Sequence, residues 1–155
     1  MRERYKTLIR LLPARTYVEK LAAIYFRDIN WQYFSIDEPV FYQLMERWYS
    51  VPFSVLSTSG LQALDPILRA FPALVFQMLA SSLLYLPEGM EETFEPLKYT
   101  SNMTFDDLAF DYSESGISIL SLLGKRQMSI MTVLAGWVRA AFLKYTGMVT
   151  EAVSS

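Results

Sequence analysis

The sequence contains neither cysteine nor histidine. Without cysteine there is no disulfide framework, no thiolate nucleophile and no cysteine-based zinc site. Without histidine there is no Ser-His-Asp or Cys-His arrangement, no imidazole ligand for a metal and no histidine general base. These two absences exclude the commonest catalytic and metal-binding arrangements.

Charge is also scarce, since only 19% of the 155 residues are charged and 14 basic residues nearly balance 16 acidic ones. The resulting net charge of −2 disfavours a strongly basic clamp for nucleic acid. Apolar residues make up 52% of the chain and aromatic residues 15%, which excludes an intrinsically disordered chain. At this length one domain is expected. The apolar excess has two interpretations: a well-filled core, or a surface that faces a partner or a missing part of a larger domain.

Neither of the two most apolar stretches resembles a membrane span. Residues 71–87 are bracketed by two prolines and include Gln77, whereas a spanning helix needs about 20 predominantly apolar residues. Residues 128–143 contain Arg139, and the charged start of the chain is not followed by a signal-peptide core. We therefore expect both stretches to be core helices, with no membrane contact.

Helical periodicity dominates the chain, and no run of strict alternation is long enough to predict a strand. Residues 73–86 are apolar nearly all round, which is typical of a central buried helix, and Phe71–Pro72 predicts a kink or a fresh start before it. The sequence thus predicts an all-α fold, an irregular array of five to seven helices within one region, residues 1–155. Four further stretches have apolar residues at steps of three and four, and their predicted buried faces are Val18, Leu21, Ala22, Tyr25 and Ile29; Phe41, Leu44, Met45 and Trp48; Leu108, Tyr112, Gly116, Ile119, Leu120 and Leu123; and Ile130, Val133, Leu134, Trp137 and Ala141.

Helix boundaries are signalled by capping residues and glycines. Asp37 and Asp65 each stand just before a proline and predict helix starts, because aspartate caps free amides and proline is tolerated in the first turn. Thr104 is a further N-cap candidate, and Gly124 and Gly147 are predicted helix stops.

The charged motifs point to helix ends rather than to catalysis. Glu91–Glu92 and Asp106–Asp107 are neighbours in sequence, so neither pair shares one helix face, and both are expected to be solvated or at helix starts. Gly124–Lys125 lacks the earlier glycine and the following Ser/Thr of a phosphate-binding loop. Lys125–Arg126 is expected to offset a helix dipole. We predict no catalytic, cofactor-binding or metal-binding residue, and no enzyme activity.

An aromatic cluster precedes and enters the second predicted helix. Only Arg27 is interleaved with it, which favours core packing over a platform for stacking nucleic-acid bases. We expect Trp31 and Trp48, on or beside apolar faces, to contribute to stability rather than to a site. The cluster comprises Tyr25, Phe26, Trp31, Tyr33, Phe34, Phe41 and Tyr42.

Four segments in order carry a resemblance to a known family. They are residues 11–13 with 25–41 (LLP and YFRDINWQYFSIDEPVF), 71–80 (FPALVFQMLA), 112–128, and 132–151, which includes RAAFLKYTG. Together they resemble the fungal-specific transcription factor domain, the regulatory region of fungal zinc-cluster activators of the xylanolytic-activator type. Residues that look family-defining are Tyr25, Phe26, Trp31 and Phe41, and packing is their expected role.

The resemblance implies a helical region that regulates activation, receives an inducer or partner, supports dimerisation and acts in the nucleus on transcription by RNA polymerase II. Family members bind zinc and DNA through a six-cysteine cluster that this cysteine-free chain does not contain. The family pattern also continues beyond "E-[AS]-W-H", whereas Glu151–Ala152 is followed here by Val153. We therefore expect the N-terminal half of the regulatory domain.

The implied partners are proteins, or a second copy of this chain, bound through apolar helix faces. We expect contact with DNA only through the missing module, and no cofactor in this chain. The alternative is a standalone helical protein–protein interaction module without DNA binding. An enzyme is a third hypothesis, for which no converging set of carboxylate, lysine, tyrosine or serine residues is visible.

Overall fold

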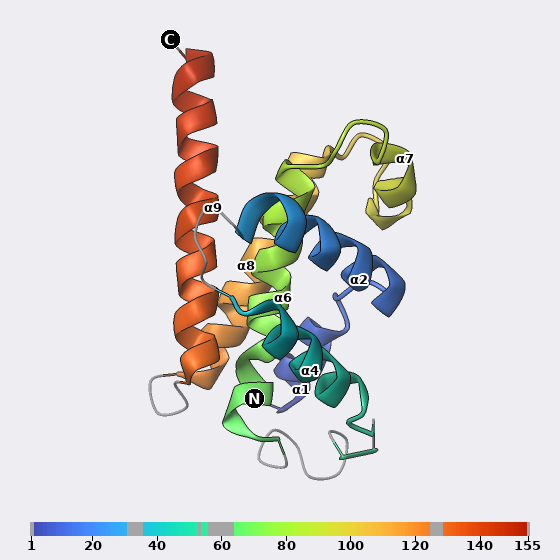
Figure 1. Cartoon of the computed structure of the whole chain (residues 1–155), viewed down its shortest axis with the longest axis vertical. Coiled ribbons are helices and arrows are strands. Elements are labelled where there is room, and N and C mark those ends of the chain that lie inside the picture. The colour runs from blue at the N-terminus through green and yellow to red at the C-terminus, as the bar shows by residue number, and fades with distance from the viewer. Residues whose placement is uncertain (1, 31–35, 53, 56–63, 125–128, 155) are drawn as a thin grey trace.

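A computed structural model describes residues 2–30, 36–52, 54–55, 64–124 and 129–154. In these ranges every regular element is helical, which confirms the all-α prediction. Figure 1 shows an irregular array of helices rather than a regular bundle. The elements are α1 (Arg2–Ile9), α2 (Arg15–Ile24), the π-helix η1 (Tyr25–Ile29), α4 (Glu38–Tyr49), α6 (Pro66–Leu84), α7 (Glu91–Phe94), the 3-10 helix η3 (Glu95–Leu97), α8 (Phe105–Leu123) and α9 (Ile130–Ser154).

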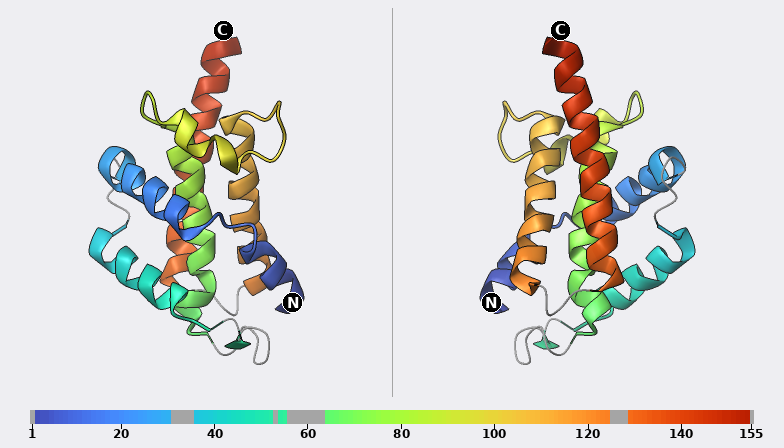
Figure 2. Two further views of the ribbon diagram at one scale, coloured as in Figure 1. Left: turned by 90° about the vertical axis from the view of Figure 1, so that its right-hand side faces the viewer. Right: turned by 90° about the vertical axis from the view of Figure 1, so that its left-hand side faces the viewer.

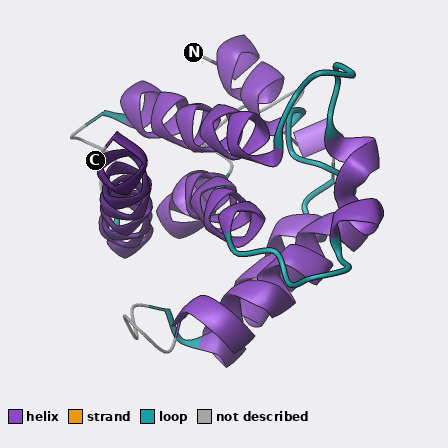
Figure 3. Cartoon of the chain, turned by 90° about the horizontal axis from the view of Figure 1, so that it is seen from above, coloured by secondary structure: helices purple, strands orange, loops and turns teal. Residues whose placement is uncertain are grey.

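Helix α6 occupies the centre of the fold and packs against α2, η1, α4, α8 and α9 (Figures 1 and 3). All of its residues from Ala70 to Leu83 are buried. Neighbours on every side explain why its sequence is apolar all round. It is also the one helix in the described ranges that is long and apolar enough to cross a membrane, but 83% of that window is buried inside the molecule.

The N-terminal helices confirm two predicted faces. The whole predicted face of α2 and η1 is buried, and Phe41, Leu44 and Met45 of α4 are buried while Trp48 is half-buried. Asp37 caps α4 by accepting a hydrogen bond from the Val40 amide at 3.2 Å, and Asp65 caps α6 through the Ile67 amide at 2.9 Å. Figure 2 shows α2 and α4 together on one side of α6.

Helix α8 begins and ends as the sequence predicts. Thr104 and Asp107 form a reciprocal capping box, with 3.0 Å hydrogen bonds in both directions, and Gly124 closes the helix at a φ of +66°. Five predicted core residues are buried, while Leu120 is partly buried against the core. Burial raises the pKa of Tyr112 in this face to about 12.

Two predicted helix boundaries are wrong. Helix α6 makes no fresh start at Pro72, which lies inside the helix, because burial on all sides outweighs one missing backbone hydrogen bond. Helix α9 continues through Gly147, whose φ is not positive, to Ser154. Between α6 and α8 lie the short helices α7 and η3, and Phe94 of α7 is fully buried against the core.

Candidate functional site

Helix α9 lies along the outside of the molecule, and its C-terminal end projects beyond the other helices (Figures 1 and 2). Its inner face packs on α6 through Met131, Ala135, Val138 and Phe142, each at most 5% exposed. The Phe142 ring also meets Phe110 of α8 at a centroid distance of 5.3 Å. One face of α9 therefore belongs to the core.

A hydrogen-bonded network fixes the rotation of α9 about its axis. Gln77 of α6 and Ser113 of α8 are both fully buried and exchange two hydrogen bonds, of 2.6 and 2.9 Å. Arg139 of α9 donates to Ser113 Oγ at 2.8 Å and to the Glu114 carboxylate at 2.9 Å. Buried polar groups are costly unless they are paired, so this network holds three helices in one arrangement.

The same network requires a glycine on α8. A Cβ atom at Gly116 would lie 2.6 Å from Gln77 Nε2 and 3.0 Å from the Ala73 carbonyl oxygen. The absence of a side chain therefore allows α8 to approach α6 closely enough for Gln77 to reach Ser113.

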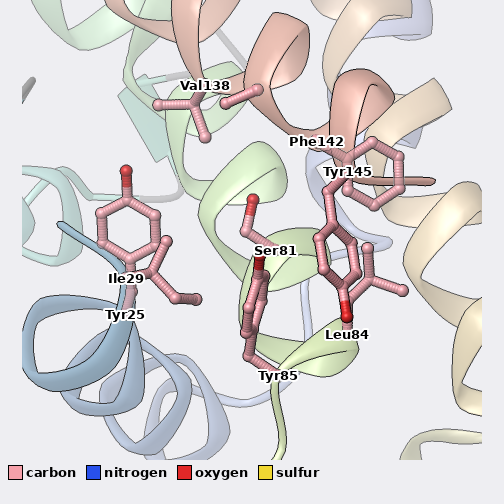
Figure 4. Close-up of a pocket in the computed structure, with 9 residues that line it drawn as sticks. Tyr25, Ile29, Ser81, Leu84, Tyr85, Val138, Phe142 and Tyr145 are labelled. Atoms are coloured by element: carbon pink, nitrogen blue, oxygen red, sulfur yellow. The ribbon is translucent and has the colours of Figure 1, made fainter. Parts of the chain in front are cut away.

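A crevice lies where η1, α6 and α9 meet (Figure 4). Two of its lining rings, those of Tyr85 and Tyr145, contact each other at a centroid distance of 4.5 Å and a tilt of 37°. Its enclosed space is only about 10 Å³, about the minimum for one water molecule, so it is no ligand site. Its lining residues are Tyr25, Ile29, Ser81, Leu84, Tyr85, Val138, Ala141, Phe142 and Tyr145.

A larger pocket of about 330 Å³ lies between α4, α6 and the first turns of α9. Eight of its nine lining residues are apolar, and the ninth is Asp37. Val40 and Ile130 are exposed at 46% and 58%, so the pocket has apolar residues accessible to solvent. Its lining residues are Ile36, Asp37, Val40, Phe41, Leu44, Leu74, Ile130, Met131 and Leu134.

The solvent-facing side of α9 is also apolar, which contradicts the predicted inward face. Ile130, Val133 and Trp137 are 53–58% exposed instead of buried, and Leu134 and Ala141 are only partly buried. The helix carries two apolar faces, and the structure buries the other one. We call the exposed row the outer stripe: Ile130, Val133, Trp137, Ala140, Lys144 and Gly147, all exposed.

The residues that the sequence singled out lie mostly in the core. Tyr25, Phe26 and Phe41 join Phe71 in a chain of aromatic contacts with centroid distances of 5.3–5.6 Å, as the packing role predicts. Trp31, Tyr33, Phe34 and Lys125–Arg126 fall outside the described residues.

The acidic pairs lie at helix starts, as predicted. Glu91–Glu92 and Asp106–Asp107 are exposed in the first turns of α7 and α8. Within the described ranges, no three or more Asp, Glu, His or Cys residues gather in a group that could hold a metal.

Comparison of the chain with models of protein families, with curated proteins and with solved structures finds no match. Functional inference therefore depends on the residues and their arrangement. The most distinctive feature of that arrangement is the outer stripe together with the neighbouring apolar pocket.

Proposed function

We propose that this chain is the regulatory helical region of a fungal zinc-cluster transcription factor, comprising the N-terminal half of that domain. In this role it acts in the nucleus on transcription by RNA polymerase II, through contacts with other proteins. Zinc and DNA are bound by a separate module, since this chain has no cysteine.

One observation carries the proposal: the segments that resemble the family meet in the core. Gln77, Ser113 and Arg139 come from the second, third and fourth segments and form one hydrogen-bonded network. Phe41 of the first segment and Phe71 of the second are in ring contact at 5.4 Å. A resemblance scattered over unrelated surface positions would lack this spatial connection.

The geometry favours contact over catalysis. In the described ranges, Asp37 and Asp107 cap helices, and other acidic side chains lie in surface ion pairs such as Arg15–Glu19 and Arg47–Asp65. The two tyrosines with strongly raised pKa values, Tyr5 and Tyr112, owe the shift to burial. Neither is poised near neutral pH for acid–base chemistry.

A reporter assay tests the regulatory role. The chain is placed between a heterologous DNA-binding domain and an acidic activation domain in a fungal host, and a flexible linker of equal length serves as the reference. We expect the chain to change reporter output several-fold, and Trp137→Glu on the outer stripe to remove the change at equal protein level. Output equal to that of the linker would refute a regulatory role.

The encoding transcript supplies an independent test. We expect it to encode six closely spaced cysteines upstream of this region in the same reading frame. A transcript without them would favour the second candidate, a standalone helical interaction module. The exposed outer stripe supports that candidate as well, because exposed apolar patches mark interaction sites whatever the cellular role.

A further inference from the structure

The outer stripe has the spacing of a helix–helix seam. Its six residues follow one another at steps of three, four, three, four and three, although all six face solvent. Alternating steps of three and four residues form the heptad pattern by which two helices pack along their length. Five of the six residues are uncharged, and Trp137 is 58% exposed. The pattern therefore predicts that a second helix packs against the outer stripe.

We propose that the outer stripe binds the outer stripe of a second copy of this chain, with the two α9 helices antiparallel. In an antiparallel pair related by a two-fold axis, the numbers of any two residues that face each other add up to the same total. When the axis passes level with the Val138–Arg139 peptide, Trp137 faces Ala140 and Ile130 faces Gly147 of the second copy. Trp137 and Ile130 each then face a small residue, so the centre and the ends of the stripe are complementary to themselves.

Charge complementarity supports the same register. Lys144 of the second copy faces Val133, one turn from Ile130, which lines a pocket together with Asp37. Among the described residues neither Lys144 nor Asp37 has an ion-pair partner. Antiparallel pairing places Lys144 of each copy at the end of the other copy's α9 where Asp37 and Ile130 line the pocket, so opposite charges share each end of the seam.

Parallel pairing lacks this complementarity. It would place Lys144 against Lys144, Trp137 against Trp137 and Gly147 against Gly147. The first contact is repulsive, the second is overfilled and the third leaves a void. Access does not restrict either arrangement, because α9 faces outward along its length in the right-hand view of Figure 2.

The pairing does not depend on a transcriptional role, and sedimentation of the purified 155-residue chain tests it. The stripe spans about 27 Å of helix, which is short for a stable interface, so we expect a reversible monomer–dimer equilibrium in the micromolar range. Trp137→Glu should raise the dissociation constant by about 30-fold or more, as loss of a central aromatic residue does.

The matched control is Tyr99→Glu, which introduces the same charge at a 67% exposed aromatic residue away from α9. We expect the control to dimerise like the wild type, and both variants to keep the wild-type circular dichroism spectrum. A wild-type chain that stays monomeric at several hundred micromolar would overturn the pairing, as would a Trp137→Glu chain that dimerises like the control.

Cross-linking tests the register, and the absence of native cysteine makes any introduced thiol unique. In the proposed pair, Ala140 lies within about 5 Å of its symmetry mate along the axis, whereas Ile130 is displaced by about 25 Å. Ala140→Cys should therefore cross-link efficiently with a short bis-maleimide, and Ile130→Cys should not. Equal cross-linking at both positions would indicate parallel helices and overturn the antiparallel arrangement.

Charge variants test the end contacts. Lys144→Glu should weaken the dimer through repulsion from Asp37, and adding Asp37→Asn should restore part of the affinity, because asparagine still caps α4. If the second substitution does not restore affinity, Asp37 does not lie at the interface. A monomeric chain whose Trp137→Glu variant still loses reporter regulation would assign the stripe to a different protein, which overturns the pairing while the proposed function stands.

Discussion

Helices α8 and α9 both pack on α6, but they use their apolar residues differently. Helix α8 has one apolar face, which is buried, and Phe110 is its one large apolar residue that is well exposed. Helix α9 has two apolar faces, one on α6 and one in solvent. A helix that is apolar all round is normally enclosed on all sides, as α6 is. The apolar face of α8 is thus enclosed within this chain, whereas α9 keeps an apolar face in solvent, and this is the face that we propose binds a second copy.

The strongest test of this difference deletes one aromatic side chain from the buried packing between α6 and α8 and one from the exposed face of α9. Phe76 of α6 is fully buried, 5.9 Å from the Tyr112 ring of α8, and Phe76→Ala should cost about 3–5 kcal/mol of unfolding free energy. Trp137→Ala should change it by less than about 0.5 kcal/mol in dilute, monomeric protein. Urea unfolding measures both. Similar losses would mean that Trp137 belongs to the core and would abolish the distinction.

The ends and the buried face of α8 could be predicted from the sequence. Capping chemistry predicts the two ends of α8, at Thr104 and Gly124. A single apolar period predicts its buried face from Leu108 to Leu123, because the opposite face is polar and only one side can be buried. Tyr25 and Phe41 were likewise predicted as core residues because an apolar face at helical spacing surrounds each of them.

Periodicity could not predict which face of α9 is buried. The sequence has two apolar faces there, one containing Ile130 and Trp137 and the other Val138 and Phe142, and each satisfies helical spacing. The choice is made by tertiary contacts of Arg139, which must reach Ser113 and Glu114 on α8. A signal was nevertheless present, because the row beginning at Ile130 keeps strict heptad spacing as far as Gly147, which is typical of a seam with a second helix.

We expect the next largest loss of unfolding free energy from a change in the polar network that orients α9. Ser113→Ala removes the hydroxyl that donates to Gln77 Oε1 at 2.6 Å and accepts from Arg139 at 2.8 Å. Buried partners left unpaired should cost about 1–3 kcal/mol. Ser115→Ala, which removes a hydroxyl bonded only to the Asp111 carbonyl one turn back, is the control and should change little. Equal effects on urea unfolding would show that the network does not hold α9.

The same glycine substitution should have opposite effects on stability in the two helices. Gly116→Ala would place a methyl group 2.6 Å from Gln77 Nε2 and 3.0 Å from a backbone oxygen of α6. Gln77 is held by two hydrogen bonds and cannot simply move aside. We expect a loss of about 1–3 kcal/mol, measured by thermal and urea unfolding. A variant as stable as the wild type would show that α8 can withdraw from α6 without penalty.

The smallest expected effect is a gain at Gly136 on α9. An added Cβ atom there meets nothing within 4 Å, and the position is exposed within a regular helix. Alanine restricts the unfolded backbone more than glycine does, so Gly136→Ala should stabilise the chain by about 0.5–1 kcal/mol. The substitution is made in the Trp137→Glu background, so that self-association cannot contribute, and stability is measured by urea unfolding beside Gly116→Ala in the same background. A loss at Gly136 would mean that another part of the chain covers this side of α9, and the contrast between a closed α8 and an open α9 would fail.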